Sequence, residues 1–162
     1  MAVNKYKPHV WVVPEDDANR QLANGFLLHP SVVVTCIDIR RPAGGWARVL
    51  DEFSAVHISD LRKYTDRHLV LLIDFDGQVT QRTQLFRDRC PPDVSGRVYL
   101  LGRRDEPEPF RTMVGQPLEK IGTCLAGACA DGWPGMWRHA QLTDNGAELA
   151  RLKMCVKPFL FS

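Results

Sequence analysis

The chain has 162 residues, 44% of them hydrophobic, which is enough for one compact domain with a sizeable core but too short for two full-sized domains. Its 21 basic and 19 acidic residues leave a net charge of +2, which excludes the strongly basic composition of a protein that coats nucleic acid. No apolar stretch has the length of a membrane span and no signal-peptide core follows Met1, so we expect one cytoplasmic domain, residues 1–162, without membrane association.

The first predicted strand, about His9 to Val13, is followed by the acidic residues Glu15, Asp16 and Asp17. Acidic side chains are favoured where helices begin, and an apolar residue at every fourth position predicts a helix over residues 16–28. We interpret Asp16 and Asp17 as caps of this helix. Glu15, directly after the strand, is a candidate for chemistry.

Strand and helix patterns then alternate. A valine-rich strand is predicted over 31–39, a helix over 46–53 and a polar stretch over 57–68. The run Leu69–Ile73 is apolar on both faces, as expected for the buried central strand of a parallel sheet. A helix over 79–89 and a strand over 97–101 follow. The pattern predicts an α/β fold, with a Rossmann-like, mostly parallel sheet flanked by helices.

The last third of the chain carries helical patterns over 108–114, 117–130 and 144–155, without a convincing strand between them. We therefore expect a core of about residues 9–105 and a helical C-terminal extension of about residues 106–162. The chain ends on Phe159-Leu160-Phe161, which we expect to pack on the core.

Acidic residues also follow the central strand, as Asp74-Phe75-Asp76. Side chains two residues apart on a strand point the same way, and the carboxyl ends of parallel strands meet at one edge of the sheet. Glu15, Asp74 and Asp76 are therefore predicted to form a site for Mg²⁺ or Mn²⁺, completed by a substrate phosphate. Glu15 could act as a general acid or base if neighbouring charge raises its pKa.

A third acidic patch follows the strand at 97–101. Its Glu106 and Glu108 are weaker candidates for metal ligands. The alternative is that they begin a helix, with Pro107 in the first turn and the two glutamates complementing the helix dipole.

The glutamate after the first strand and the Asp-x-Asp after a later one resemble the Toprim domain of topoisomerases, bacterial primases, ribosomal-RNA maturases and overcoming-lysogenisation-defect nucleases. Glu15 matches the family's glutamate, and Asp74 and Asp76 match its second motif, over about residues 9–105. Two features depart from the family: Asp16 replaces the glycine that follows the glutamate, and Gly77 directly follows the Asp-x-Asp motif, where the family has its glycine a few residues later.

The resemblance implies a Mg²⁺-dependent nuclease or other phosphoryl-transfer protein that acts on nucleic acid, in phage defence or DNA repair, with Glu15, Asp74 and Asp76 as catalytic residues. The first alternative is a catalytically degenerate Toprim-like module that binds nucleic acid or an ATPase partner. The sequence has no phosphate-binding GxxxxGK[ST] loop of its own, so ATP use would depend on that partner.

A second alternative is a haloacid dehalogenase-like phosphatase, because Asp74-Phe75-Asp76-Gly77 also resembles that family's signature, in which the first aspartate is the nucleophile. The threonine usual after the glycine is Gln78 here, and no acidic pair follows a later strand.

Overall fold

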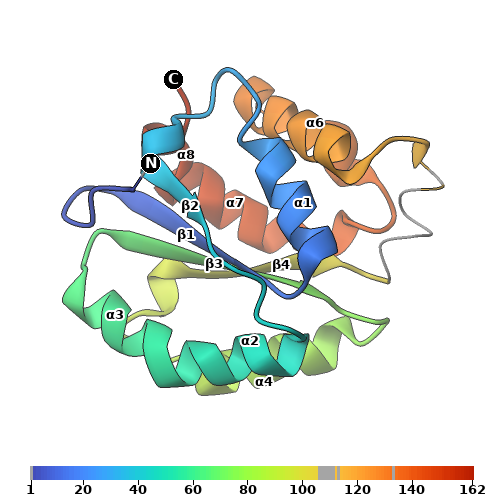
Figure 1. The fold of residues 1–162 in the computed structure, drawn as a ribbon. Helices are drawn as coiled ribbons and strands as arrows, with labels where there is room; N and C mark the ends of the chain where they lie inside the picture. Colours follow the sequence, from blue (N-terminus) through green and yellow to red (C-terminus); the bar gives the residue numbers. More distant parts are fainter. Residues whose placement is uncertain (1, 106–111, 113, 133) are drawn as a thin grey trace.

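A computed structural model describes residues 2–105, 112, 114–132 and 134–162 of the chain (Figure 1). The helices and strands given for these residues are, in chain order, β1 (His9–Pro14), α1 (Asp17–Phe26), a 3₁₀ turn (Val34–Cys36), β2 (Ile37–Ile39), α2 (Trp46–Glu52), a π-helical segment (Phe53–His57), α3 (Ile58–Lys63), β3 (Arg67–Asp74), α4 (Val79–Arg89), a 3₁₀ turn (Ser95–Arg97), β4 (Val98–Arg103), α6 (Leu118–Asp131), 3₁₀ turns (Gly135–Arg138 and Thr143–Asn145), α7 (Gly146–Cys155) and α8 (Lys157–Leu160).

The strands form one parallel sheet of four in the order β2-β1-β3-β4. β3 lies inside the sheet, and its residues Leu69 to Ile73 alternate between the two faces, which explains why this run is apolar throughout. The predicted α/β class, with a parallel sheet flanked by helices and a helical C-terminal segment, is confirmed.

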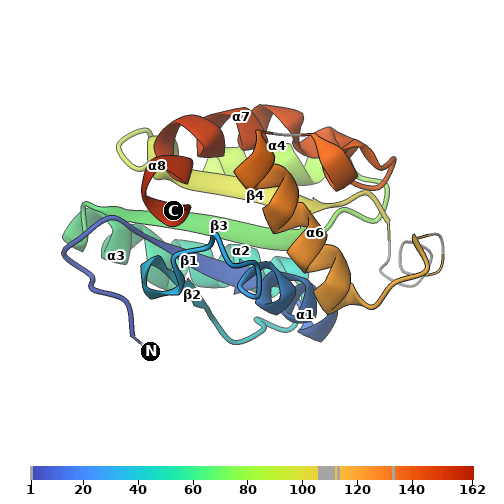
Figure 2. The same ribbon diagram turned by 90° about the horizontal axis from the view of Figure 1, so that it is seen from above.

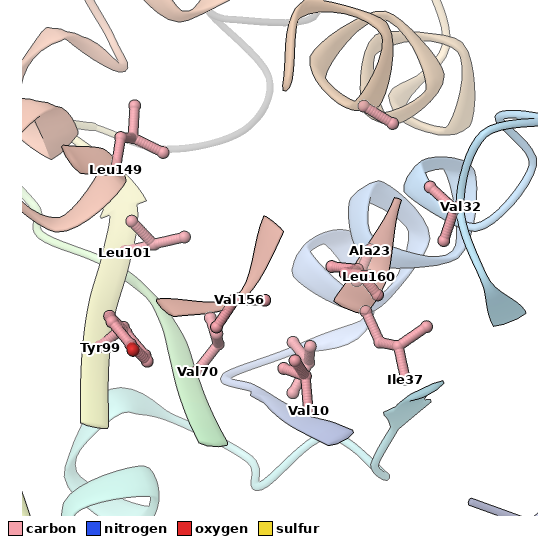
Figure 3. Close-up of a cluster of buried hydrophobic side chains, with 12 residues drawn as sticks. Val10, Ala23, Val32, Ile37, Val70, Tyr99, Leu101, Leu149, Val156 and Leu160 are labelled. Atoms are coloured by element: carbon pink, nitrogen blue, oxygen red, sulfur yellow. The ribbon is translucent and has the colours of Figure 1, made fainter. Parts of the chain in front are cut away.

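Helices cover both faces of the sheet (Figure 1). On one face α1, α6, α7 and α8 enclose an apolar cluster that includes Val10, Val70, Leu101 and Leu160 (Figure 3). On the other face α2, α3 and α4 pack against a second cluster around Leu69, Leu71 and Phe86. Phe159 and Phe161 pack against the first cluster, as predicted.

The strands that follow the two inner strands are placed on opposite sides of the sheet. β1 leads through α1 to β2 on one side, whereas β3 leads through α4 to β4 on the other. α1 and α4 lie on opposite faces of the sheet (Figure 1). The carboxyl ends of β1 and β3 therefore border the point where the strand order reverses, which is where open α/β sheets bind their ligands.

α6 holds α1 in place by direct backbone contact. A Cβ added to Gly122 of α6 would lie 2.0 Å from the carbonyl oxygen of Leu22, and one added to Gly25 of α1 would lie 1.9 Å from that of Glu119. The hydroxyl of Thr123 donates to the Gly25 carbonyl oxygen at 2.7 Å. Only glycine permits this approach, so the helical extension supports the helix that follows β1.

Side chains of α7 bond the outer edge of β4, beside which α7 runs (Figure 2). Asn145, just before α7, accepts from the Gly102 amide and donates to the Gly102 carbonyl, both at 2.9 Å. Glu148 accepts from the Leu100 amide at 2.8 Å, and Arg151 donates to the Val98 carbonyl at 3.1 Å. Backbone groups that an edge strand leaves free are thus satisfied by α7 and the residue that precedes it.

The strand predicted over 31–39 is wrong in its first half. Val32 instead forms an antiparallel bridge with Phe161, and the Val33 amide donates to the Leu160 carbonyl at 2.7 Å, so this segment pairs with the end of the chain. The stretch 57–68 is helical as far as Lys63, because the helix that begins at Trp46 continues through it.

Within the part of the chain that the structure describes, no helix combines the length and apolarity needed to cross a membrane.

Candidate metal centre

The ends of β1 and β3 bring two acidic residues together. Pro14 is the last residue of β1, and the amide of Glu15 donates to the Leu72 carbonyl at 2.8 Å, which continues the strand pairing by one residue. Glu15 Oε2 in turn accepts from the amide of Asp74, the last residue of β3, at 2.6 Å. Glu15 and Asp74 therefore meet at one edge of the sheet, although 59 positions separate them in sequence.

Asp16 completes an acidic cluster with Glu15 and Asp74. One carboxylate oxygen of each residue lies within 4.8 Å of the other two. Glu15 and Asp74 are only 9% and 5% exposed. Among the described residues this is the group whose spacing could hold a metal ion. Three carboxylates at this spacing are unfavourable unless protons, cations or hydrogen-bond donors compensate them.

Asp16 has two roles. It is the N-cap of α1, as its acidic character predicted, and its Oδ1 accepts from the Asn19 amide at 2.9 Å. The turn that makes this cap also directs the carboxylate toward Glu15 and Asp74. Asp17 lies outside the cluster, is exposed and pairs with Arg20 and Gln21. The helix-cap interpretation is therefore confirmed for Asp16, but Asp16 also belongs to the site.

Asn19 and Arg103 connect the cluster to the protein interior. Asn19 is fully buried; its Nδ2 donates to Asp16 Oδ1 at 3.0 Å and to Asp74 Oδ1 at 3.3 Å, and its Oδ1 accepts from Arg103 Nη2 at 3.3 Å. Arg103, 1% exposed, donates to Asp74 Oδ1 from Nε at 3.2 Å and from Nη2 at 2.8 Å. Within the described chain all these bonds to the Asp74 carboxylate end on Oδ1, which leaves Oδ2 for a ligand.

Burial and neighbouring charges shift the pKa of Glu15 and of Asp74. Burial raises the pKa of Glu15 to about 7, the bond from the Asp74 amide opposes this, and the charges of Asp74, Asp16 and Asp76 add to the rise. Burial also raises the pKa of Asp74, against the opposing effect of Arg103. Glu15 therefore exchanges a proton near neutral pH, as a general acid or base must.

Asp76 does not join the cluster. β3 ends at Asp74, and Asp76 and Gly77 follow in a tight turn with φ angles of +49° and +74°. The side chain of Asp76, 45% exposed, accepts from Arg82 Nη1 at 2.9 Å. The expectation that Asp74 and Asp76 point the same way holds on a continuous strand, and the turn interrupts the strand between them.

Arg82 connects this turn to the end of β3 and to Trp46 of α2. Its guanidinium also donates to the Asp74 carbonyl and lies 4.4 Å from the centre of the Trp46 ring. Asp76 therefore lies outside the acidic cluster. Its charge contributes to the raised pKa of Glu15, and its carboxylate pairs with Arg82.

The two weaker candidates, Glu106 and Glu108, lie outside the described residues. Their neighbour Asp105 has its amide and its carboxylate bound by Gln141, at 2.8 and 2.9 Å.

Sequence reasoning missed Asn19 and Arg103 as parts of the site. Asn19 lies one helical turn after Asp16 and follows the cap, a signal that the sequence contains. Arg103 is visible only once β4 is extended to its true end, because the parallel register then pairs it with Asp74.

The donor set fits a hard divalent cation, which prefers carboxylate oxygens and keeps several waters. The carboxylates of Asp74, Asp16 and Glu15 are the groups available to hold such an ion. Arg103 is a fixed positive charge bound to the same Asp74, so a bound cation and this guanidinium repel each other.

The chain matches no protein-family model, no curated protein and no solved structure with which it was compared.

Proposed function

We propose that the acidic cluster binds Mg²⁺ or Mn²⁺ and supports phosphoryl transfer on nucleic acid, with phosphodiester hydrolysis as the reaction, in a Toprim-like protein. The observation that carries the proposal is the spacing of the Glu15, Asp16 and Asp74 oxygens, within 4.8 Å of one another where the strand order reverses. When bound, the ion would polarise a phosphate oxygen and neutralise its charge.

The chain's own residues have separate roles in this proposal. Asp74 and Asp16 hold the cation, because Asn19 donates to both carboxylates and fixes them in place. Glu15, with its pKa raised to about 7, holds or releases the proton of the attacking or leaving oxygen. Asp76, predicted as a ligand, instead pairs with Arg82, and its charge helps to raise the pKa of Glu15.

Calorimetric titration of Mg²⁺ and Mn²⁺ tests the cation site. We expect saturable binding in the wild type that Asp74→Asn abolishes. Asp17→Asn is the matched control, because Asp17 adjoins Asp16 but lies outside the cluster, and it should bind like the wild type. Nicking of plasmid DNA and cleavage of RNA by the same three proteins then test the reaction. Absence of binding in the wild type would exclude the cation-dependent activity.

The Arg103–Asp74 ion pair favours a second candidate, a degenerate Toprim-like module that binds nucleic acid or an ATPase partner. A guanidinium that already neutralises Asp74 can replace the stabilising effect of a cation. The described C-terminal helices do not present an apolar face to such a partner: among large apolar residues, Met154 is the exposed one that they carry.

The phosphatase alternative predicts a covalent aspartyl-phosphate on Asp74, whereas the cation-dependent cleavage proposed above forms none at that residue. Incubation with a phosphate ester, acid quenching and mass spectrometry of the Asp74 peptide distinguish the two.

A further inference from the structure

A second polar cluster lies at the amino ends of β1 and β3, opposite the carboxyl ends that carry the acidic residues. Arg67 begins β3 and is the register partner of His9 at the start of β1. It is 1% exposed, and its guanidinium carbon lies 3.5 Å from the centre of the Trp11 ring and 4.7 Å from that of Tyr64. Trp11 also contacts His57 edge to face. We call Arg67, Trp11, His57 and His9 the Arg67 cluster.

The Nε of Arg67 has a partner. It donates to His9 Nε2 at 3.0 Å. His9 Nδ1 lies 2.7 Å from the Lys7 carbonyl oxygen, which can only accept. The proton of His9 is therefore on Nδ1, and Nε2 is free to accept from Arg67.

The other two nitrogens of Arg67 have none. Among the described residues, Nη1 and Nη2 are buried without a hydrogen-bond partner, and Asp60 Oδ2 lies 3.8 Å from Nη1, beyond hydrogen-bond distance. Trp11 Nε1 and His57 Nδ1 are also buried and, among the described residues, have no hydrogen-bond partner. Four of the six such atoms in the described residues thus belong to Trp11 and to two residues that contact it, Arg67 and His57. Buried polar groups normally have partners, so this concentration indicates a missing ligand.

His57 is held in place by the π-helical segment Phe53–His57. Such segments are rare and occur frequently at functional sites. His57 Nε2 lies 3.1 Å from Glu52 Oε2, so a neutral His57 carries its proton on Nε2 and offers Nδ1 as an acceptor.

We propose that the Arg67 cluster binds a phosphate group. Nη1 and Nη2 form the end-on fork of a guanidinium, which matches two oxygens of a phosphate, and Trp11 Nε1 is a third donor. His57 Nδ1 accepts from the protonated oxygen of a monoester or hydrogen phosphate, a contact that a carboxylate cannot supply.

The charges around the cluster are balanced. Arg40 stacks on Trp11 and pairs with Asp38, Asp60 faces Arg67, and Glu52 faces His57. The attraction for phosphate therefore comes from unsatisfied donors more than from net charge.

Entry depends on the N-terminal segment. Lys5 and Tyr6 both contact the ring of Tyr64, which in turn contacts Arg67. In the proposed site, this segment would have to move aside to admit the phosphate.

The indole N–H of Trp11 reports directly on binding. Inorganic phosphate is titrated into ¹⁵N-labelled protein in metal-free chloride buffer, and the indole signals of the four tryptophans are followed, with Trp11→Phe to assign the relevant one. We expect a saturable shift of the Trp11 signal that acetate does not reproduce. Arg67→Lys keeps the charge but loses the fork, and should weaken binding by about tenfold or more. Arg62→Lys, an exposed arginine paired with Asp93, is the matched control.

Asp60→Asn covers the case in which Arg67→Lys does not fold. It removes the carboxylate that faces Nη1, and phosphate should then bind several-fold more tightly. The proposal is overturned if the Trp11 signal does not move saturably in the wild type, or if Asp60→Asn leaves the affinity unchanged. It is independent of the acidic cluster at the other edge of the sheet, so Asp74→Asn should bind phosphate normally.

Discussion

Asp74 and Arg103 are paired residues at the ends of neighbouring strands, and the guanidinium of Arg103 donates two hydrogen bonds to a single oxygen of Asp74. The carboxylate of Asp74 also belongs to the acidic cluster with Glu15 and Asp16. A buried ion pair and a candidate cation site therefore share one carboxylate, and the affinity of the site for a cation depends on both.

Arg103→Gln should bind Mg²⁺ more tightly than the wild type. The substitution removes a fixed positive charge next to Asp74 but keeps a hydrogen-bond donor, and the loss of repulsion should strengthen binding by about tenfold at low ionic strength. Calorimetric titration at pH 8 measures the change. Arg104→Gln, which alters an exposed arginine paired with Asp144, is the control and should change nothing. Weaker binding in Arg103→Gln would instead make this arginine a support for the site.

Glu15 should make the free protein less stable as pH rises. Its pKa is about 7 in the folded chain and near 4.5 when unfolded, so the folded state holds the extra proton between these values. The stabilisation is complete below pH 4.5 and is lost as pH rises through 7, which amounts to about 3 kcal/mol. Urea unfolding of the wild type and Glu15→Gln in metal-free buffer at pH 5 and pH 8 measures this effect. From pH 5 to pH 8 the free energy of unfolding of the wild type should fall relative to that of the variant by about that amount. Parallel pH profiles would contradict it.

His68 should have the opposite effect at acid pH. Burial, then the charges of Arg97 and His9, lowers its pKa from 6.5 to about 4. A lowered histidine pKa gives stability that is present above 6.5 and is lost as pH falls toward 4. Because His68 Nδ1 lies 3.2 Å from the Tyr99 hydroxyl, His68→Gln keeps a polar partner. Between pH 7 and pH 4.5 the wild type should lose about 2–3 kcal/mol more than His68→Gln.

Gly122→Ala should destabilise the chain and weaken the acidic site together. The new methyl group would lie 2.0 Å from the Leu22 carbonyl oxygen, so α6 must move away from α1. Overpacking of this kind costs about 1–3 kcal/mol, which urea unfolding can measure. Since α1 carries Asp16 and Asn19 at its start, Mg²⁺ affinity should fall as well. Gly146→Ala is the control, because nothing lies within 4 Å of a Cβ at that position.

The central strand could be predicted because its run Leu69–Ile73 is apolar throughout, and most of the longer helices because local sequence signals mark their positions. The predicted helix over 79–89 has the bounds of α4, and β3 extends the predicted run by only a few residues. The segment around Val32 has the composition of a strand, but its partner is Phe161, and a pairing across 129 positions has no local signal.

The acidic site was only partly predictable for a similar reason. Glu15 and Asp74 were expected because both follow strands, whose carboxyl ends meet. Asp76 was misplaced because its positive φ angle belongs to the turn and not to the strand. Arg103 depends on the strand register, which a single sequence does not reveal, whereas the position of Asn19 one turn after the helix cap was a signal that we overlooked.

The two edge strands, β4 and β2, differ in how far their backbone groups are already bonded. Asn145, Glu148 and Arg151 bond the outer backbone groups of β4. A foreign strand that approaches β4 meets backbone groups already in use, whereas β2 offers a run of three residues, Ile37–Ile39. Self-association by strand addition is therefore discouraged on one side by occupied hydrogen bonds and on the other by shortness. Loss of the three α7-side contacts would expose a six-residue template, so such variants should form intermolecular β-structure while the chain is otherwise folded.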